Sequence, residues 1–154
     1  MKRTVLLFIT IILISSCSQK ETESKKKTSP NQNAIEGSWK MIYADIKEND
    51  SVQVKDLSNT DFIKIINKSH FAFFNQDRGS EENFFAGGGT YELNGDQYAE
   101  TLDFINSEAY RGHVFTFNVE VKGDTLIQHG KETIEEANID RYILEKYIRI
   151  KPAQ

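Results

Sequence analysis

The stretch VFTFNVEV, residues 114–121, decides the fold class of this chain. Its apolar side chains occupy alternate positions, and Thr116, Asn118 and Glu120 occupy the positions between them. Successive side chains of an extended strand point to opposite faces. The alternation therefore predicts a β-strand with one apolar, buried face and one polar face.

Comparable segments lie on both sides of this stretch, and turn residues separate them. Lys122-Gly123-Asp124 leads into the segment 125–127, and the pair Asn94-Gly95 is a strong hairpin signal. Residues 132–138 are a candidate for a short helical turn, and no segment with helical periodicity is long enough for a βαβ unit. The other segments rich in β-forming residues are 39–43, 62–66, 70–74, 90–93, 98–104 and 142–150.

This order of about eight short strands, joined mostly by hairpins, predicts an all-β domain that is either a closed barrel or a sandwich. Closure is favoured because it removes the exposed edges of the sheet. A barrel of about eight strands has an interior that side chains fill or that holds one small ligand.

Gly37-Ser38-Trp39-Lys40, near the start of the first predicted strand, resembles the Gly-x-Trp motif of lipocalins and related calycin barrels. More of the chain resembles one family, the bacterial lipocalin-like domains of unknown function that occur in Bacteroidetes lipoproteins. At Tyr147 that family usually has tryptophan, so the aromatic character is kept. The resembling stretches are 37–40, 64–74, 87–91, 98–101, 115–117 and 145–149, which together span nearly all of residues 35–150.

The resemblance implies a single small up-and-down antiparallel β-barrel over residues 34–154. In such a barrel Trp39 covers the closed end, and Gly37 lets the chain turn tightly into the first strand. Arg149 resembles the lipocalin arginine whose guanidinium lies over that tryptophan ring, which is a cation–π contact. The alternative for Arg149 is a solvated charge at the end of a strand.

The N-terminus has the layout of a secretory signal peptide, because Lys2 and Arg3 precede a short apolar run over residues 5–14. The run is shorter than the roughly 20 apolar residues of a membrane-spanning helix. Ile14-Ser15-Ser16-Cys17 resembles the bacterial lipobox, which implies cleavage before Cys17 and lipidation of its thiol. We therefore expect a lipoprotein signal peptide at residues 1–16 and a membrane anchor at Cys17.

Residues 17–33 form the expected tether, because after Cys17 they contain no aliphatic or aromatic side chain and cannot bury apolar surface. Ser18 stands where enterobacterial lipoproteins of the inner membrane have aspartate, so an outer-membrane location is expected. Gln19-Lys20-Glu21 resembles the surface-export signal of Bacteroidetes lipoproteins. Display on the cell surface and display toward the periplasm both stay open.

Composition excludes several kinds of partner and site. Loss of Lys2 and Arg3 takes the 19 basic residues to 17 against 23 acidic ones, a net charge of −6 that disfavours nucleic acid. The single cysteine is Cys17, which leaves no disulfide, cysteine metal ligand or cysteine nucleophile. None of the three histidines has a metal-ligand spacing, and phosphate-loop and serine-nucleophile motifs are absent. We therefore expect no metal and no cofactor.

Glu100 is the candidate polar anchor for a ligand. It shares a predicted strand face with Tyr98, Leu102 and Phe104, so it is expected to point inward with them. A buried carboxylate requires a partner, and the alternatives are a structural hydrogen bond or a position in water at the barrel mouth. Asp103 is expected on the opposite face, which leaves no second inward carboxylate for acid–base catalysis.

The chain is rich in phenylalanine, and in a small barrel these rings are first of all core candidates. Phe84 and Phe85 are expected in a mouth loop where a ligand enters, and the glycines 87–89 are expected to let a strand bend or bulge. The tentative ligand-binding residues are Phe73, Phe84, Phe85, Tyr91, Tyr98, Glu100, Phe104 and Phe117.

Three functions from different classes stay open, because a fold does not determine a function. The first expectation is a membrane-tethered, non-enzymatic protein that binds a small apolar or amphipathic ligand. The second is an interaction module, a filled barrel that binds an envelope protein or a glycan. An enzyme would need clustered inward acids or a histidine with a partner. The oligomeric state is not predicted.

Overall fold

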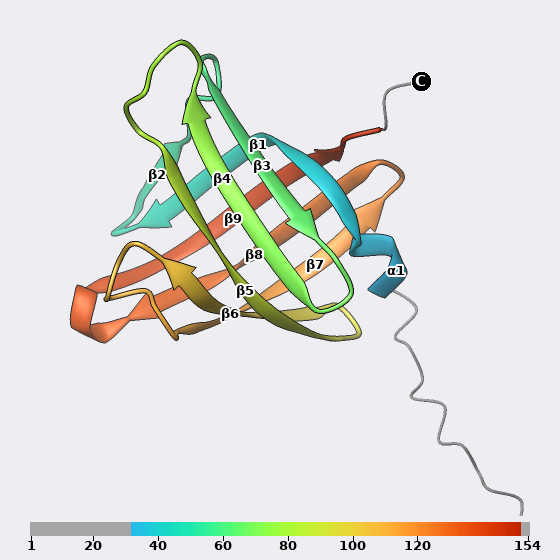
Figure 1. Cartoon of the computed structure of the whole chain (residues 1–154). Coiled ribbons are helices and arrows are strands. Elements are labelled where there is room, and N and C mark those ends of the chain that lie inside the picture. The colour runs from blue at the N-terminus through green and yellow to red at the C-terminus, as the bar shows by residue number, and fades with distance from the viewer. Residues whose placement is uncertain (1–31, 152–154) are drawn as a thin grey trace, which may run out of the picture.

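Strands make up most of residues 32–151, which are the residues that this computed structural model describes (Figure 1). The expected signal peptide at residues 1–16 and the lipidated Cys17 lie outside the described residues, as does nearly all of the expected tether. The elements are α1 (Gln32–Ile35), β1 (Gly37–Glu48), β2 (Ser51–Val54), β3 (Thr60–Ile66), β4 (His70–Asp77), β5 (Phe85–Asn94), β6 (Gln97–Ile105), β7 (Val114–Lys122), β8 (Thr125–Ile134), η1 (Glu135–Ala137) and β9 (Ile139–Arg149).

The strands form one antiparallel sheet that closes on itself. Each strand from β3 to β8 pairs with the next one in sequence, β1 pairs with β3, and β9 pairs back with β1. These eight strands are the closed up-and-down barrel that the sequence predicts. Strand β2 is an addition at the edge of β1. Within residues 32–151, no helix is long and apolar enough to cross a membrane.

One edge of β1 is shared between two neighbours. Its first residues, Gly37 to Lys40, pair with β3, whereas Asp45 to Glu48 pair with β2. The opposite edge pairs with β9 along nearly the whole strand. The wall of the barrel therefore divides beside the second half of β1, away from α1.

Trp39 and α1 close one end of the barrel. The Trp39 side chain is fully buried, and its indole N–H donates a hydrogen bond to the carbonyl oxygen of Ile35 at 2.8 Å. The Arg149 guanidinium lies 4.0 Å from the centre of the Trp39 ring. It also donates hydrogen bonds to the carbonyl oxygens of Ala34 and Glu36, both at 2.6 Å. Arg149 therefore makes the ring contact that the resemblance implies, and it holds α1 on the barrel.

Gly37 makes room for this arrangement. Its φ angle is +142°, a conformation that residues with a Cβ rarely adopt. A Cβ at this position would collide with Nη1 of Arg149. Glycine is therefore required at this position both for the backbone conformation at the start of β1 and for the space that the Arg149 guanidinium occupies.

The opposite end of the barrel is the mouth. Because successive strands alternate in direction, the short turns after β3, β5 and β7 lie at the same end as α1. The longer connections 78–84, 106–113 and 135–138 lie at the mouth (Figure 1). Loops at the open end of a barrel are where a ligand enters.

A bulge interrupts the pairing of β5 with β6. The register shifts between Gly88 and Thr90, so two residues of β6 face Gly89 alone. A Cβ at Gly89 would collide with the carbonyl oxygen of Thr101, so only glycine allows this close approach. The bend or bulge expected at glycines 87–89 is thus present.

The bulge moves Phe104 to the outside of the barrel. Strict alternation along β6 holds from Tyr98 to Leu102 and then shifts by one residue. Ile105 is buried, whereas Phe104 is 71% exposed. The prediction that Phe104 points inward with Tyr98 and Leu102 is therefore wrong, because the extra residue at the bulge reverses the faces beyond it.

Four further elements differ from the sequence prediction. Strand β8 continues to Ile134 before the single turn η1, so only the second half of residues 132–138 is helical. The four-residue elements α1 and β2 are not predicted by the sequence at all. They are too short for any periodicity to become apparent.

Candidate functional site

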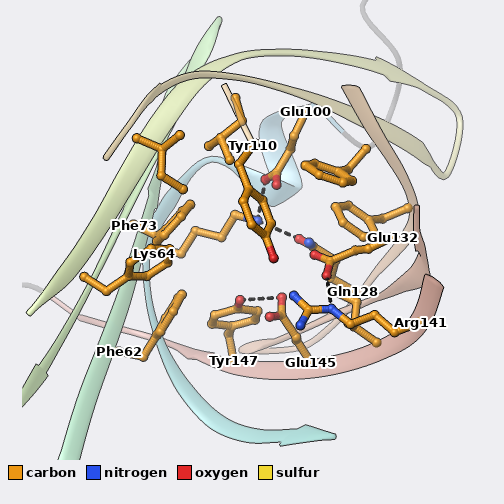
Figure 2. Close-up of a pocket in the computed structure, with 16 residues that line it drawn as sticks. Phe62, Lys64, Phe73, Glu100, Tyr110, Gln128, Glu132, Arg141, Glu145 and Tyr147 are labelled. Carbon is orange, nitrogen blue, oxygen red and sulfur yellow. Dashed lines mark hydrogen bonds and ion pairs between the residues drawn. The ribbon is translucent and has the colours of Figure 1, made fainter. Parts of the chain in front are cut away.

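The barrel interior contains a cavity of about 180 Å³ (Figure 2). Four aromatic rings lie side by side along its wall. The ring centres of Tyr147 and Phe62 are 6.2 Å apart, and those of Phe62 and Phe73 are 5.6 Å apart. Phe73 lies 5.6 Å from Phe85 at the mouth. The apolar wall is completed by Leu102, Ile105, Tyr110, Phe115, Phe117 and Ile143.

Lys64 on β3 carries its ammonium group into the deep end of the cavity. Its side chain is only 2% exposed. The Nζ atom lies 2.5 Å from Oε1 of Glu100 on β6, and it donates a hydrogen bond to Oε1 of Gln128 on β8 at 2.7 Å. A buried charge is tolerated when it is paired and hydrogen-bonded in this way. Three strands from different parts of the barrel are therefore linked at this point (Figure 2).

Three aromatic rings surround the same ammonium group. The Nζ atom of Lys64 lies 5.5 Å from the ring centre of Phe71, 5.2 Å from that of Tyr98 and 5.9 Å from that of Tyr147. Each distance is within the range of a cation–π contact. Burial and the neighbouring Glu100 carboxylate raise the pKa of Tyr98 well above its usual value, so this ring stays neutral beside the ion pair.

A second ion pair lies nearer the mouth. The Nε of Arg141 on β9 donates a hydrogen bond to Oε2 of Glu132 on β8 at 2.6 Å. Both side chains are partly buried, and both line the cavity. Each of the two cations at the cavity wall is thus neutralised by a carboxylate of the protein.

Glu145 on β9 is different, because no lysine or arginine within residues 32–151 forms an ion pair with it. Its Oε2 accepts a hydrogen bond from the hydroxyl of Tyr147 at 2.7 Å. Burial raises the pKa of Glu145, and the carboxylates of Glu100 and Glu132 add to this rise. The Lys64 charge and the Tyr147 hydroxyl oppose it without cancelling it.

A second cavity, of about 330 Å³, adjoins the first at the mouth. Both are lined by Phe62, Glu132, Arg141, Ile143 and Glu145. The second cavity extends to β2, where the exposed Lys55 stands at its rim. The space inside the barrel therefore reaches the surface beside the second half of β1, where the wall divides.

The predicted ligand-binding residues fall into three groups. Phe73, Phe85, Glu100 and Phe117 line the interior cavity. Tyr91 and Tyr98 lie outside its lining, with ring centres 5.0 Å apart, and the Tyr91 hydroxyl donates a hydrogen bond to the carbonyl oxygen of Asn67 at 2.6 Å. Phe84 and Phe104 line a groove on the outer surface. Phe84 lies in the connection 78–84 at the mouth, as expected, but its side chain is 62% exposed and lines the outer groove instead of the interior cavity.

The outer groove has a volume of about 570 Å³ and lies over β4, β5 and β6. The exposed rings of Phe74, Phe84 and Phe104 form its apolar surface, together with Ala72 and Ala86. Contiguous apolar surface of this kind is a feature of interaction sites on soluble domains.

The expectation that Glu100 is the only inward carboxylate is wrong. Glu132 and Glu145 line the same cavity, whereas Asp103 is exposed on the outer face as predicted. Within the described residues no group of three histidine, cysteine, aspartate or glutamate side chains has the geometry of a metal site.

Sequence reasoning also misses Lys64, Gln128 and Arg141. The alternation of side chains along each strand could have placed them in the interior. Lys64, for example, points to the same face of its strand as Phe62 and Ile66. Gln128 alternates in the same way with Leu126, and Arg141 and Glu145 with the buried positions of β9. Polar residues on an apolar face are the informative exception.

Replacing Glu145 by glutamine is expected to weaken the loss of stability with rising pH. Because the folded-state pKa of Glu145 is raised, its contribution is fully present below the unfolded value near 4.5 and is lost as pH rises through the folded value. The free energy of unfolding of the wild type should therefore fall relative to that of Glu145→Gln as pH rises above about 4.5, as measured by chemical denaturation.

The matched control is Glu92→Gln, because Glu92 is exposed on β5. Its pH profile should run parallel to that of the wild type. Parallel profiles for the wild type and Glu145→Gln would show that burial does not disfavour the charged form of Glu145.

The family model described as "Domain of unknown function (DUF4488)" matches residues 34–154. The match includes α1 in part, the whole barrel and all the residues of the interior cavity. The comparison with curated proteins found no match.

Proposed function

The chain belongs to the DUF4488 family, and we propose that its barrel binds a small amphipathic molecule in the interior cavity. The observation that carries this proposal is the cavity of about 180 Å³, which combines an aromatic wall with charged groups at its deep end. Ligand sites in proteins are typically concave, mostly apolar and equipped with a few polar groups that set orientation.

The size of the cavity limits the ligand. An engineered apolar cavity of about 150 Å³ holds benzene, so the interior cavity accommodates a single ring with a short substituent. A longer molecule would have to extend into the adjoining cavity near β2. A rigid ligand with several fused rings, such as a haem, does not fit the barrel as it stands.

We further propose that the role is one of binding and not of catalysis. Two of the three carboxylates at the cavity wall are held by cations, Glu100 by Lys64 and Glu132 by Arg141. A carboxylate that is ion-paired with a lysine or arginine is less available to accept a proton from a substrate. This arrangement favours fixed recognition groups over a general acid–base pair.

The location is a proposal from the sequence of residues 1–17. We propose that the barrel is a lipoprotein of the kind found in Bacteroidetes, held at the outer membrane by lipid on Cys17, with surface and periplasmic display both possible. Labelled fatty acid should enter the wild type and fail to enter Cys17→Ser. Equal labelling of the two proteins would contradict the anchor.

The function is tested by native mass spectrometry and organic extraction of the full chain purified from its own envelope. The expected result is a reproducible small molecule, present at up to one copy per barrel. The control is Leu102→Trp, which places a larger side chain in the cavity wall and should lower the occupancy while costing about 1–3 kcal/mol of stability. A protein that is empty and also fails to bind small aromatic and aliphatic probes would contradict the proposal.

A second candidate function is an interaction module, and the outer groove favours it. Phe74, Phe84 and Phe104 of the groove are exposed, although the interior of the barrel contains a cavity and is not completely filled. Replacing Phe104 by serine separates the two candidates, because this residue lines only the outer groove. Unchanged ligand occupancy with loss of a protein or glycan partner would favour the second function.

A further inference from the structure

We infer that the ligand of the interior cavity carries a positive charge, and that Glu145 is its counter-ion. This inference rests on the proposed function, since it specifies the class of molecule that the same cavity binds. It follows from the balance of charges at the cavity wall, the position of Glu145 and the aromatic rings beside it.

The charges that face the cavities do not cancel. Lys64 is paired with Glu100, and Arg141 is paired with Glu132, at distances of 2.5 and 2.6 Å. Glu145 remains as the carboxyl group without a cation among the described residues that line the interior cavity. Lys55 and Asp45 both line the second cavity, and their opposite charges add no net charge there.

The position of Glu145 suits a ligand group better than a structural role. Its side chain lines both cavities, so it lies where the interior joins the opening beside β1. Figure 2 shows the carboxyl group between the Tyr147 hydroxyl, to which it is hydrogen-bonded, and the side chain of Arg141. Only one hydrogen bond to it, from the Tyr147 hydroxyl, occurs within residues 32–151. A carboxylate can accept several more.

The wall next to Glu145 is aromatic. The faces of Tyr147, Phe62 and Phe73 follow one another with ring centres 6.2 and 5.6 Å apart. Aromatic faces attract cations, and a carboxylate beside them supplies the opposite charge. The barrel already uses this chemistry for its own ammonium group, because the Lys64 Nζ is surrounded by Phe71, Tyr98 and Tyr147.

An anionic ligand fits the same cavity less well. Lys64 and Arg141 are each already neutralised by a carboxylate, so an anion beside either of them would add a second negative charge to a partly buried site. An ammonium or guanidinium group of a ligand, in contrast, could pair with Glu145 without breaking either ion pair. A neutral ligand would leave Glu145 without a counter-ion.

The test compares three probes of nearly equal size, namely benzylamine, benzyl alcohol and benzoate. Their dissociation constants for the full chain are measured by isothermal titration calorimetry. Benzylamine is expected to bind about tenfold or more tighter than benzyl alcohol, and benzoate more weakly than either. In Glu145→Gln the dissociation constant of benzylamine should become about equal to that of benzyl alcohol.

Glu92→Gln serves again as the control, because it removes the same charge from the exposed face of β5. It should keep the preference for benzylamine, which separates a local effect of Glu145 from a change in net charge. Tyr147 can still donate its hydrogen bond to the glutamine oxygen in Glu145→Gln, so this variant is expected to fold.

The outcomes distinguish the inference from the proposed function. Equal binding of the three probes, or a preference that survives in Glu145→Gln, overturns the inference and leaves a cavity that binds neutral molecules. Tightest binding of benzoate overturns it in favour of Lys64 or Arg141 as the anchor. Failure of all three probes to bind overturns the inference together with the proposed function for ligands of this size.

Discussion

Replacing Lys64 by methionine is expected to lower the free energy of unfolding by about 3–5 kcal/mol. The ammonium group lies 2.5 Å from the Glu100 carboxylate and donates to Gln128 at 2.7 Å. Methionine fills a similar volume but leaves Glu100 without a cation in the interior. Because small domains are stable by only about 5–15 kcal/mol, this single change removes a large part of the stability.

The double variant Lys64→Met, Glu100→Leu separates the missing charge from the missing side chain. Replacing both members of a buried ion pair by apolar residues is often neutral or stabilising. Chemical denaturation of the two variants and the wild type should therefore show that the second change restores most of the loss. A cost of less than about 1 kcal/mol for Lys64→Met would contradict a buried, paired ammonium group.

Replacing Arg149 by alanine is expected to cost about 2–4 kcal/mol and to shift the emission of Trp39 to longer wavelength. The guanidinium donates to the carbonyl oxygens of Ala34 and Glu36 and covers the Trp39 ring. Its loss frees α1 and lets water reach the indole. Since Trp39 is the single tryptophan, its fluorescence reports on this site alone.

The matched control for Arg149→Ala is Lys151→Ala. Lys151 lies two residues further along the chain, and it makes an exposed ion pair with Asp124 at 2.8 Å. Exposed pairs contribute at most about 1 kcal/mol, so this variant should keep the wild-type emission and nearly all the stability. An unchanged spectrum in Arg149→Ala would mean that the guanidinium does not cover the ring.

The barrel itself could be predicted from the sequence because its strands keep a strict period of two. The stretch at residues 114–121 forms β7 with Phe115, Phe117 and Val119 buried and the residues between them exposed. The Gly-x-Trp resemblance then selects a barrel over a sandwich. The structure explains why this motif needs glycine at position 37, because a Cβ there would collide with the Arg149 side chain.

The site could be predicted only in part. Glu100 was found because its strand alternates clearly, but its partner Lys64 is more than thirty residues away on β3, and no local pattern joins them. Pairing across a closed barrel depends on the register and stagger of all the strands between. A period of two indicates that Lys64 points inward without indicating what it meets there.

Phe104 shows a second limit. A single bulge reverses the faces of all later residues in a strand, and its position depends on how closely two backbones approach. Here the approach occurs at Gly89, opposite the carbonyl oxygen of Thr101. The three glycines indicate that a bulge is near, but not at which residue of β6 the alternation changes.

The central claim is that the barrel interior is a small-molecule site, and methyl NMR during a titration with benzyl alcohol tests it most directly. Saturable shifts are expected for the methyl groups of Leu102 and Ile143, which line the interior cavity and not the outer groove. The methyl groups of Ala72 and Ala86, which line the outer groove, should not move. Shifts confined to these two alanines, or no saturable shift of the interior methyl groups, would contradict it.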